Sequence, residues 1–344
     1  MSENLALYRK YRPSNFAEVK DQEHIVSVLE GALKKKTIPH AILFSGTRGT
    51  GKTTLARIFA KALGVSDVDI YEIDAASNRG IDDVRELREA VYTLPYESER
   101  KVYIIDEVHM LTKEAFNALL KTLEEPPSHV VFILATTEEE KVLDTILSRC
   151  QVFRMRSPSR AVLASTVTEV AKKEGFSISA EVADLIAIAA DGSFRDALGV
   201  TQKVIMASGD SVGSAEEVAT IIGAPKFETL RALVSALHKK NIEDALTVTN
   251  EVVGAHTDMK LFVRLLLERV RAIILLRNTP KNSVILLKQF GTEDATYLEA
   301  LAKETPSALN SHLLVALLSA TESTGKSVLP QLPLELAIIE TLSK

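Results

Sequence analysis

The segment 46–53, GTRGTGKT, has the residue types and spacing of a phosphate-binding loop. It fits the pattern GxxxxGK[ST], in which the glycines let backbone N–H groups turn toward phosphate oxygens. A helix that begins at this loop would add the positive end of its dipole. We expect Lys52 to reach the β- and γ-phosphates of a nucleotide and the Thr53 hydroxyl to bind Mg²⁺. The segment therefore predicts binding of a nucleoside triphosphate.

Two neighbouring acids, Asp106 and Glu107, directly follow the apolar segment 102–105, VYII. If that segment is a strand, its end places both carboxylates beside the phosphate loop. We expect Asp106 to hold the water shell of Mg²⁺ and Glu107 to polarise an attacking water. A switch protein or a kinase would need only the aspartate, whereas hydrolysis needs an acceptor held in line with the water. The pair therefore favours hydrolysis of the nucleotide.

Further polar groups are candidates for contact with the γ-phosphate. Thr136 and Thr137 follow an apolar segment, and a hydroxyl at this place would sense the γ-phosphate through the water. Arg149, in the triplet Ser-Arg-Cys, and Arg195, in GSFRDAL, would supply positive charge. A lone arginine is more often a surface charge, so neither arginine is assigned a role without further context.

The elements that would position these groups alternate through the first half of the chain. Apolar, strand-like segments are expected at 41–45, 69–73, 102–105 and 130–135, and helix-like segments at 52–63, 81–91 and 113–125. Buried strands separated by helices predict a parallel sheet covered on both faces. Ligands bind such sheets at the carboxyl ends of the strands, where the candidate residues lie.

The alternation ends near Arg156, and the rest of the chain is helical by pattern. Ser157-Pro158-Ser159 and Gly223-Ala224-Pro225 interrupt the pattern. We therefore predict three domains: an α/β nucleotide domain at 1–157, a small helical domain at 158–223 and an all-α domain at 224–344.

Composition limits the class of protein. The 344 residues are 46% hydrophobic and 25% charged, which suits a folded protein with several cores and excludes wholesale disorder. The formal net charge of −5 excludes a uniformly basic nucleic-acid coat. A nucleic-acid site must therefore be a local patch.

The single cysteine, Cys150, excludes an intrachain disulfide and a cysteine-rich zinc module. The seven histidines have no metal-ligand spacing, so we expect them to be structural or surface groups. The longest apolar stretches are far shorter than the roughly 20 residues that a membrane span needs. The N-terminal segment lacks the apolar core of a signal peptide. We therefore expect a cytoplasmic protein without a membrane partner.

Taken in order, the motifs resemble the gamma/tau subunits of bacterial DNA polymerase III, which are the AAA+ ATPases of the sliding-clamp loader. The resemblance rests on a series of segments: LYRKYRP (7–13), FSGTRGTGKT (44–53), EIDAASNRG (72–80), VYIIDEVHML (102–111), FNALLKTLEEPP (116–127), ATTE (135–138), ILSRC (146–150) and GSFRDAL (192–198). Such an ordered series is far more specific than any single motif. It implies an AAA+ P-loop domain, a helical lid and an oligomerisation collar.

The resemblance also implies roles for individual residues. Thr137 would be the sensor of the γ-phosphate, Arg195 the lid arginine of the same subunit, and Arg149 the arginine finger that reaches a neighbour's ATP. The adenine or ribose would lie near Arg9, Arg12 and Pro13. The remaining nucleotide contacts would come from the phosphate loop and its flanks: Ser45, Gly46, Thr47, Arg48, Gly49, Thr50, Gly51, Lys52, Thr53 and Thr54.

The same resemblance implies partners. These are clamp-loader subunits of the delta and delta-prime type, copies of the chain itself in a pentameric ring, the sliding clamp, and primed double-stranded DNA. Duplex phosphates would bind at the start of a helix, at Ser77, Asn78, Arg79 and Gly80.

Two departures from the family pattern are visible. Most members carry a four-cysteine zinc module between the first helix and the second strand, and here 63–69 connects them directly. We therefore expect no zinc. The sequence ends at Lys344, where the collar would end, without the tail by which the tau form engages polymerase and helicase. We expect a short, gamma-like product or a truncated chain.

The sequence thus predicts an ATP-hydrolysing clamp-loader motor with ATP and Mg²⁺ as ligands. It would be counted as a subunit of a DNA-directed DNA polymerase holoenzyme, a nucleotidyltransferase complex, without polymerase activity of its own. One alternative is a non-hydrolysing structural clamp-loader subunit, against which the intact phosphate loop argues. The other is a different DNA-acting AAA+ motor, such as a branch-migration helicase or a recombination ATPase, against which IDAAS and ILSRC argue.

Overall fold

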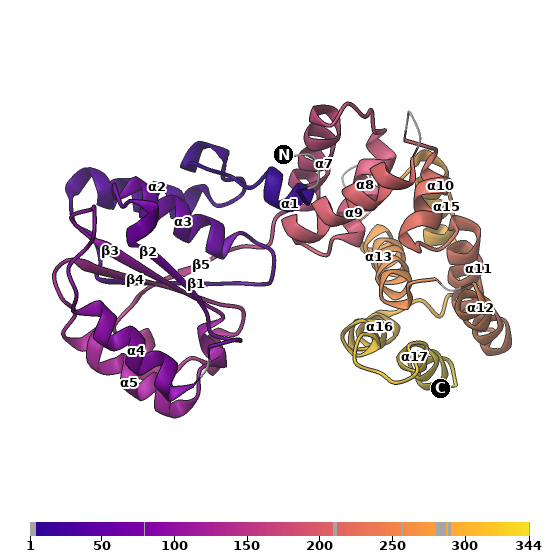
Figure 1. The fold of residues 1–344 in the computed structure, drawn as a ribbon. Coiled ribbons are helices and arrows are strands. Elements are labelled where there is room, and N and C mark those ends of the chain that lie inside the picture. The colour runs from indigo at the N-terminus through magenta and orange to yellow at the C-terminus, as the bar shows by residue number, and fades with distance from the viewer. Residues whose placement is uncertain are drawn as a thin grey trace. The chain divides into compact units, whose positions relative to one another are not determined.

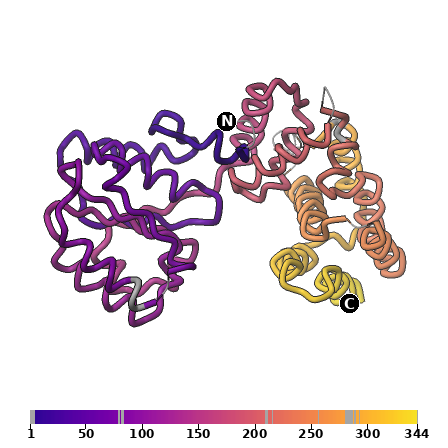
Figure 2. The backbone as a smooth tube through the Cα atoms, in the orientation of Figure 1, coloured from indigo at the N-terminus to yellow at the C-terminus, as the bar shows by residue number. Residues whose placement is uncertain are grey.

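The structure is a computed structural model that describes residues 5–78, 80–208, 212–255, 257–279, 287 and 290–343 (Figure 2). The chain divides into two compact units. The first comprises residues 1–170 and 190–202, and the second comprises residues 171–189 and 203–344. The division into three domains at residues 157 and 223 stays a prediction.

A five-stranded parallel sheet is the centre of the first unit. Its strands are β1 (Ala41–Ser45), β2 (Ile70–Asp74), β3 (Lys101–Asp106), β4 (Val130–Thr136) and β5 (Gln151–Arg154), in the order β2-β3-β4-β1-β5. β1 pairs with β4 so that Ser45 lies opposite Thr136, and β2 pairs with β3 so that Asp74 lies opposite Asp106. The carboxyl ends of all five strands therefore meet at one edge, which confirms the predicted parallel sheet.

Helices cover both faces of this sheet, as Figure 1 shows. α2 (Glu23–Lys35) and α3 (Lys52–Ala62) pack on one face through a core that includes Phe44, Phe59 and Ile104. α4 (Ile81–Val91) and α5 (Lys113–Glu124) pack on the other face, on a core that includes Tyr103 and Phe132. Since both faces are covered, β1, β3 and β4 are almost wholly buried, which explains their continuous apolar sequences.

Shorter elements complete the first unit. They are α1 (Leu7–Lys10), η1 (Phe16–Glu18), η2 (Asp67–Asp69), η3 (Val108–Met110), η4 (Glu139–Lys141) and α6 (Asp144–Leu147). Most of α7 (Arg160–Lys173) and the first part of α9 (Phe194–Ala207) also belong to it. The Gln22 side chain, which is fully buried, pairs with both backbone polar groups of Arg156 and so ties the N-terminal segment to the end of the sheet domain.

The second unit is helical. Its helices are α8 (Ala180–Ala189), α10 (Ala215–Ile222), α11 (Phe227–His238), α12 (Ile242–Gly254), α13 (Met259–Asn278), α15 (Thr292–Lys303), α16 (Ser311–Thr324) and α17 (Leu332–Leu342). α13 packs against α11, α15 and α16. Asp294 on α15 accepts from Arg231 on α11 at 2.9 Å and pairs with the buried Arg269 on α13. This charge network joins three helices within an otherwise apolar core.

Within the described parts of the chain, no helix is both long enough and apolar enough to cross a membrane.

Candidate nucleotide site

The phosphate loop connects β1 to α3 and contains three glycines whose φ angles are positive, two of which also lie close to neighbouring segments. Gly46 has φ +150°, and a Cβ there would lie 2.8 Å from the carbonyl oxygen of Met155. Gly49 has φ +76°, and its Cβ would lie 1.9 Å from Oγ of Ser193. The N–H of Phe194 donates to the Gly49 carbonyl at 3.0 Å. The loop therefore packs directly on the segment that starts α9, where a larger residue would not fit.

The Lys52 ammonium lies inside this loop. Its Nζ donates to the carbonyl oxygens of Gly46 at 2.9 Å and Thr47 at 3.0 Å, and the residue is only 5% exposed. Burial lowers the pKa of Lys52, while the nearby Glu107 and Asp106 oppose that shift. In the loop, the buried positive charge of Lys52 is hydrogen-bonded by neutral carbonyls. The negative charge of a polyphosphate would neutralise it, so the loop fits the predicted ligand.

The predicted Mg²⁺ ligands lie next to each other. The Thr53 hydroxyl donates to Oδ2 of Asp106 at 2.7 Å, and the other Asp106 oxygen accepts from the N–H of Glu107 at 3.0 Å. A hydroxyl and a carboxylate are the hard oxygen donors that Mg²⁺ prefers. Among the described residues, no group of three or more His, Cys, Asp or Glu side chains could hold a metal. Mg²⁺ would thus depend on phosphate and water oxygens for its other ligands.

Glu107 and Thr137 are in direct contact. Thr137 donates to Oε2 of Glu107 from its hydroxyl at 2.9 Å and from its N–H at 3.3 Å. Glu107 itself has φ +49°, a left-handed conformation that is uncommon for a residue other than glycine. Such backbone strain often occurs at functional positions. The structure therefore joins the predicted water-polarising acid to the predicted sensor.

A group of arginines surrounds the same region. The guanidinium of Arg195 lies 5.9 Å from the ring centre of Tyr8, and that of Arg9 lies 5.8 Å from the same ring. Burial, and then repulsion from Arg57, Arg195 and Arg9, lowers the pKa of Arg12, although Glu72 partly offsets this. Repulsion from Arg195 also contributes to the lowered pKa of Lys52. Cations crowded in this way favour a multiply charged anion.

The other predicted nucleotide contacts flank this centre. Ser45 is buried and donates to Oε2 of Glu139 at 2.6 Å, so its hydroxyl is engaged within the fold. Thr50 is also buried and donates to the Thr47 carbonyl, which shapes the loop. Arg48 is exposed, and Gly51, Thr54 and Pro13 are partly exposed.

Arg149 points to a different part of the first unit. Its guanidinium pairs with Oε1 of Glu124 on α5 at 2.6 Å and donates to the carbonyl oxygen of Thr145 at 2.8 Å. Within the described residues the structure thus places Arg149 beside α5 and α6, and not in the phosphate loop of its own chain.

The predicted DNA-contacting segment follows β2. Asp74 shapes it, since its carboxylate accepts from the N–H of Ala76 at 2.9 Å and its carbonyl accepts from the N–H of Asn78 at 2.9 Å. Ser77 and Asn78 are exposed, and Gly80 directly precedes α4. Arg79 lies outside the described residues.

From the sequence, His109 was expected to be only a structural or surface residue. Its side chain is 5% exposed and lies 3.5 Å, measured from Nδ1, from Oε2 of Glu107. The sequence feature that could have indicated its place in the site is its position two residues after the acidic pair. It has no metal-ligand spacing that would have marked it as functional.

Comparison with known proteins gives two family matches. Residues 64–159 match the family described as DNA polymerase III, delta subunit, and residues 213–343 match DNA polymerase III subunits gamma and tau domain III. The chain is 37% identical over 356 residues to the DNA polymerase III subunit tau of Bacillus subtilis, covering 97% of this chain and 62% of that protein. It is 41% identical over 269 residues to the Escherichia coli subunit tau, covering 72% of this chain and 42% of that protein. The chain thus spans less than two thirds of the length of these relatives.

Solved structures with the same fold include that of Thermotoga maritima RuvB, a Holliday junction branch migration motor. The TM-score is 0.54 at 20% identity, over 71% of this chain and 85% of that one. A point variant of the same protein also gives a TM-score of 0.54, at 19% identity. At this identity the likeness establishes the fold alone.

Proposed function

The chain belongs to the family of DNA polymerase III gamma and tau subunits, and on that basis we propose that it is an ATP-hydrolysing motor subunit of a clamp loader. The observation that carries the proposal is the cluster at the ends of β1, β3 and β4. There the buried Lys52, the Thr53–Asp106 pair and the Glu107–Thr137 pair meet around one phosphate loop. A non-hydrolysing structural subunit would have no need of this cluster.

In the proposed reaction, the loop N–H groups and Lys52 bind the phosphates of ATP. Thr53 and Asp106, which are hydrogen-bonded to each other, would hold Mg²⁺, the threonine directly and the aspartate through water. When bound, Mg²⁺ neutralises phosphate charge and orients the phosphates. Glu107 accepts the proton of the attacking water, and Thr137 orients the γ-phosphate end of the site. The main contributions are thus positioning and preorganised charge.

Two arginines complete the proposed chemistry. Arg195 contacts phosphate in the same subunit, which its proximity to Lys52 and the Tyr8 ring supports. Arg149 acts on the ATP of a neighbour. Arg149 pairs with Glu124, and both side chains are a third to a half exposed. This exposure supports the proposed role, because an exposed ion pair is weak and Arg149 can exchange Glu124 for another partner.

The adenine side of the pocket is proposed at Arg9, Arg12 and Pro13. These residues lie in and directly after α1, whose Leu7 N–H donates to Gln202 of α9 at 3.1 Å. The proposed base pocket is therefore attached to the same helix that carries Arg195.

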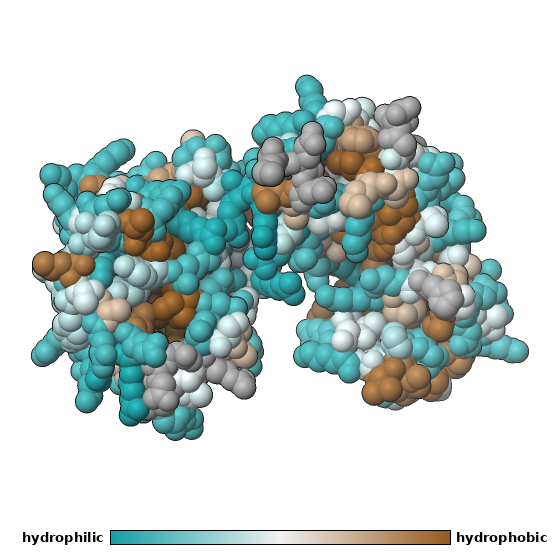
Figure 3. All heavy atoms as spheres, in the orientation of Figure 1, coloured by the Kyte–Doolittle hydropathy of each residue, from teal (hydrophilic) through white to brown (hydrophobic). Residues whose placement is uncertain are grey.

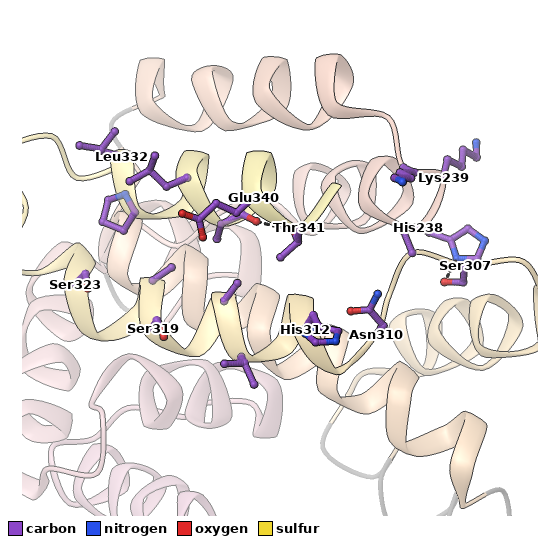
Figure 4. Close-up of a pocket in the computed structure, with 18 of the residues that line it drawn as sticks. His238, Lys239, Ser307, Asn310, His312, Ser319, Ser323, Leu332, Glu340 and Thr341 are labelled. Atoms are coloured by element: carbon purple, nitrogen blue, oxygen red, sulfur yellow. Dashed lines mark hydrogen bonds between the residues drawn. The ribbon is translucent and has the colours of Figure 1, made fainter. Parts of the chain in front are cut away.

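Assembly is proposed through the helical C-terminal part, as the collar of a ring that also contains delta- and delta-prime-type subunits. Exposed apolar side chains on α16 and α17 support this, and Figure 3 shows hydrophobic residues gathered over α17. The members of this surface are Val315, Leu318, Leu332, Leu336 and Ile339, which are 38–63% exposed. Val315, Leu332 and Leu336 of this surface also line a groove of about 1470 Å³ between the two helices, with Ser319 and Glu340 on opposite sides (Figure 4).

The remaining proposals follow from the family. The assembled ring binds the sliding clamp and primed duplex DNA, with the exposed turn at Ser77 and Asn78 near the duplex phosphates. The protein works in the cytoplasm and without zinc.

The experiment that tests the proposal is the ATPase rate of the assembled loader with and without primed DNA and the cognate clamp. Stimulation by DNA and clamp together is the expected result. Stimulation by DNA alone would favour another DNA-acting motor, for which the RuvB fold provides a precedent. No hydrolysis under any condition would leave the structural-subunit alternative.

A further inference from the structure

His109 joins two segments that the sheet no longer holds together. The paired register of β3 and β4 extends to Ile105 and Leu134, so Glu107 and Thr137 lie beyond the last backbone pair. His109 lies in η3, directly after the acids, and its ring is 5% exposed. Its Nδ1 is 2.9 Å from the hydroxyl oxygen of Thr136, at the end of β4.

The ring lies between two polar groups. Nε2 lies 3.2 Å from Oε1 of Glu138, whose other oxygen is 2.6 Å from Nζ of Lys141. An ionised carboxylate can only accept, so Nε2 is placed to donate to Glu138. Nδ1 lies within hydrogen-bond distance of the Thr136 hydroxyl.

The Thr136 hydroxyl is also tied to the backbone. Its oxygen accepts from the N–H of Glu138 at 3.0 Å. Thr137 lies between these two residues and donates both its N–H and its hydroxyl to Glu107. On its other side the end of β4 is held by β1, since Ser45 pairs with Thr136 and the N–H of Gly46 donates to the Thr136 carbonyl at 3.2 Å. The imidazole holds the same turn on the side of β3, and its Nδ1 lies 3.5 Å from the same oxygen of Glu107.

We propose that His109 is a positioning residue: through Thr136 it holds the end of β4 so that Thr137 and Glu107 keep one mutual orientation. The inference deepens the proposed function and rests on it, since Glu107 is there the group that accepts the proton from water. His109 itself contacts neither nucleotide nor water in this account. Its contribution is the geometry of two groups that do.

Two conservative variants separate the contacts of the ring. In asparagine, the amide atoms are as many bonds from Cα as Nδ1 is in histidine, so His109→Asn can keep the contact to Thr136. In glutamine, they match Nε2, so His109→Gln can keep only the contact to Glu138. We expect the kcat of the assembled loader to fall about tenfold in His109→Gln and His109→Ala, and to stay within about threefold in His109→Asn. The KM for ATP should change less than about twofold. Glu138→Gln serves as the control and should keep the parent kcat.

A second measurement needs no nucleotide. Amide hydrogen exchange of the free protein at Thr137 and Glu138 should rise about tenfold in His109→Ala and His109→Gln, and not in His109→Asn. Leu55 in α3 donates its N–H to the carbonyl of Gly51, and its exchange should stay unchanged in all three variants.

The proposal is overturned if His109→Ala leaves both kcat and exchange at the parent level. It is also overturned if all three variants lose activity and thermal stability together, because that would reflect core packing alone. A parent loader that hydrolyses no ATP, with the exchange pattern as expected, would instead contradict the proposed function and leave the positioning of Thr137 by His109 intact.

Discussion

Replacing Gly49 with alanine tests the contact between the phosphate loop and the start of α9. The new Cβ would lie 1.9 Å from Oγ and 2.8 Å from Cβ of Ser193. Rotation of the serine side chain moves Oγ but leaves its Cβ in place, so the backbone of the loop or of α9 has to shift. A left-handed φ costs alanine about 1–2 kcal/mol, and overpacking of this kind costs about 1–3 kcal/mol more. The sum is about 2–5 kcal/mol.

Gly64 offers a matched control, because its φ of +77° equals that of Gly49 within a degree and a Cβ there meets nothing within 4 Å. Gly64→Ala therefore carries the backbone cost alone, at the other end of α3. In the double variant Gly49→Ala/Ser193→Gly the clash is removed. Glycine also keeps most of the capping preference at the position where Ser193 now caps α9, with Oγ accepting from the N–H of Asp196 at 3.1 Å.

The assay is ATP affinity, measured by equilibrium titration of the full chain. We expect Gly49→Ala to weaken ATP binding at least about tenfold, Gly64→Ala to leave it within about twofold, and the double variant to recover most of the loss. Equal affinities of Gly49→Ala and Gly64→Ala would refute the packing argument. Failure of Ser193→Gly to restore binding would refute the assignment of the clash.

Three further predictions concern other parts of the chain. Arg149→Ala should leave ATP binding by the isolated subunit intact but impair hydrolysis in the assembled loader by about 10³-fold or more. Mixing these subunits with Lys52→Ala subunits should restore part of the activity. If mixed assemblies shown to contain both variants have no restored activity, Arg149 does not act across an interface. Burial raises the pKa of Asp69, but hydrogen bonds from the N–H groups of residues 96–98 outweigh that effect and lower the pKa to about 2. Ionised Asp69 therefore stabilises the fold at a pH above its unfolded pKa near 4, and this stabilisation is lost as the pH falls toward 2. The difference in unfolding midpoint between Asp69→Asn and the parent should therefore shrink over that range, and a constant difference would contradict the assignment. Purified protein should contain no stoichiometric zinc, because Cys150 alone cannot build a thiolate site, and elemental analysis that finds about one zinc per chain would overturn this.

The strands that could be predicted from sequence are those buried on both faces. β1, β3 and β4 read as continuous apolar segments for that reason, and their bounds differ from prediction by at most a residue. β2 is displaced by one residue, since Asp69 is occupied in binding the backbone of 96–98. β5 was missed because it is a short edge strand with mixed burial, and its sequence carries no continuous apolar signal.

The candidate site divides in the same way. The phosphate loop and the acidic pair are local motifs whose spacing alone predicts their chemistry. The contacts that tune them join residues far apart in the chain. Gly49 meets Ser193, His109 meets Thr136, and Arg149 meets Glu124. Such pairs depend on how strands and helices are placed in space, and a single sequence does not specify them.

The most direct test of the central claim is ATP turnover by the loader assembled with Glu107→Gln, compared with the parent in the presence of primed DNA and clamp. The amide is a poor acceptor for the proton of water, so we expect ATP binding to persist while hydrolysis falls by about 10²–10⁴-fold. In parallel, Lys52→Ala should lose binding itself. Hydrolysis at the parent rate in Glu107→Gln would contradict the assigned site and, with it, the proposed mechanism.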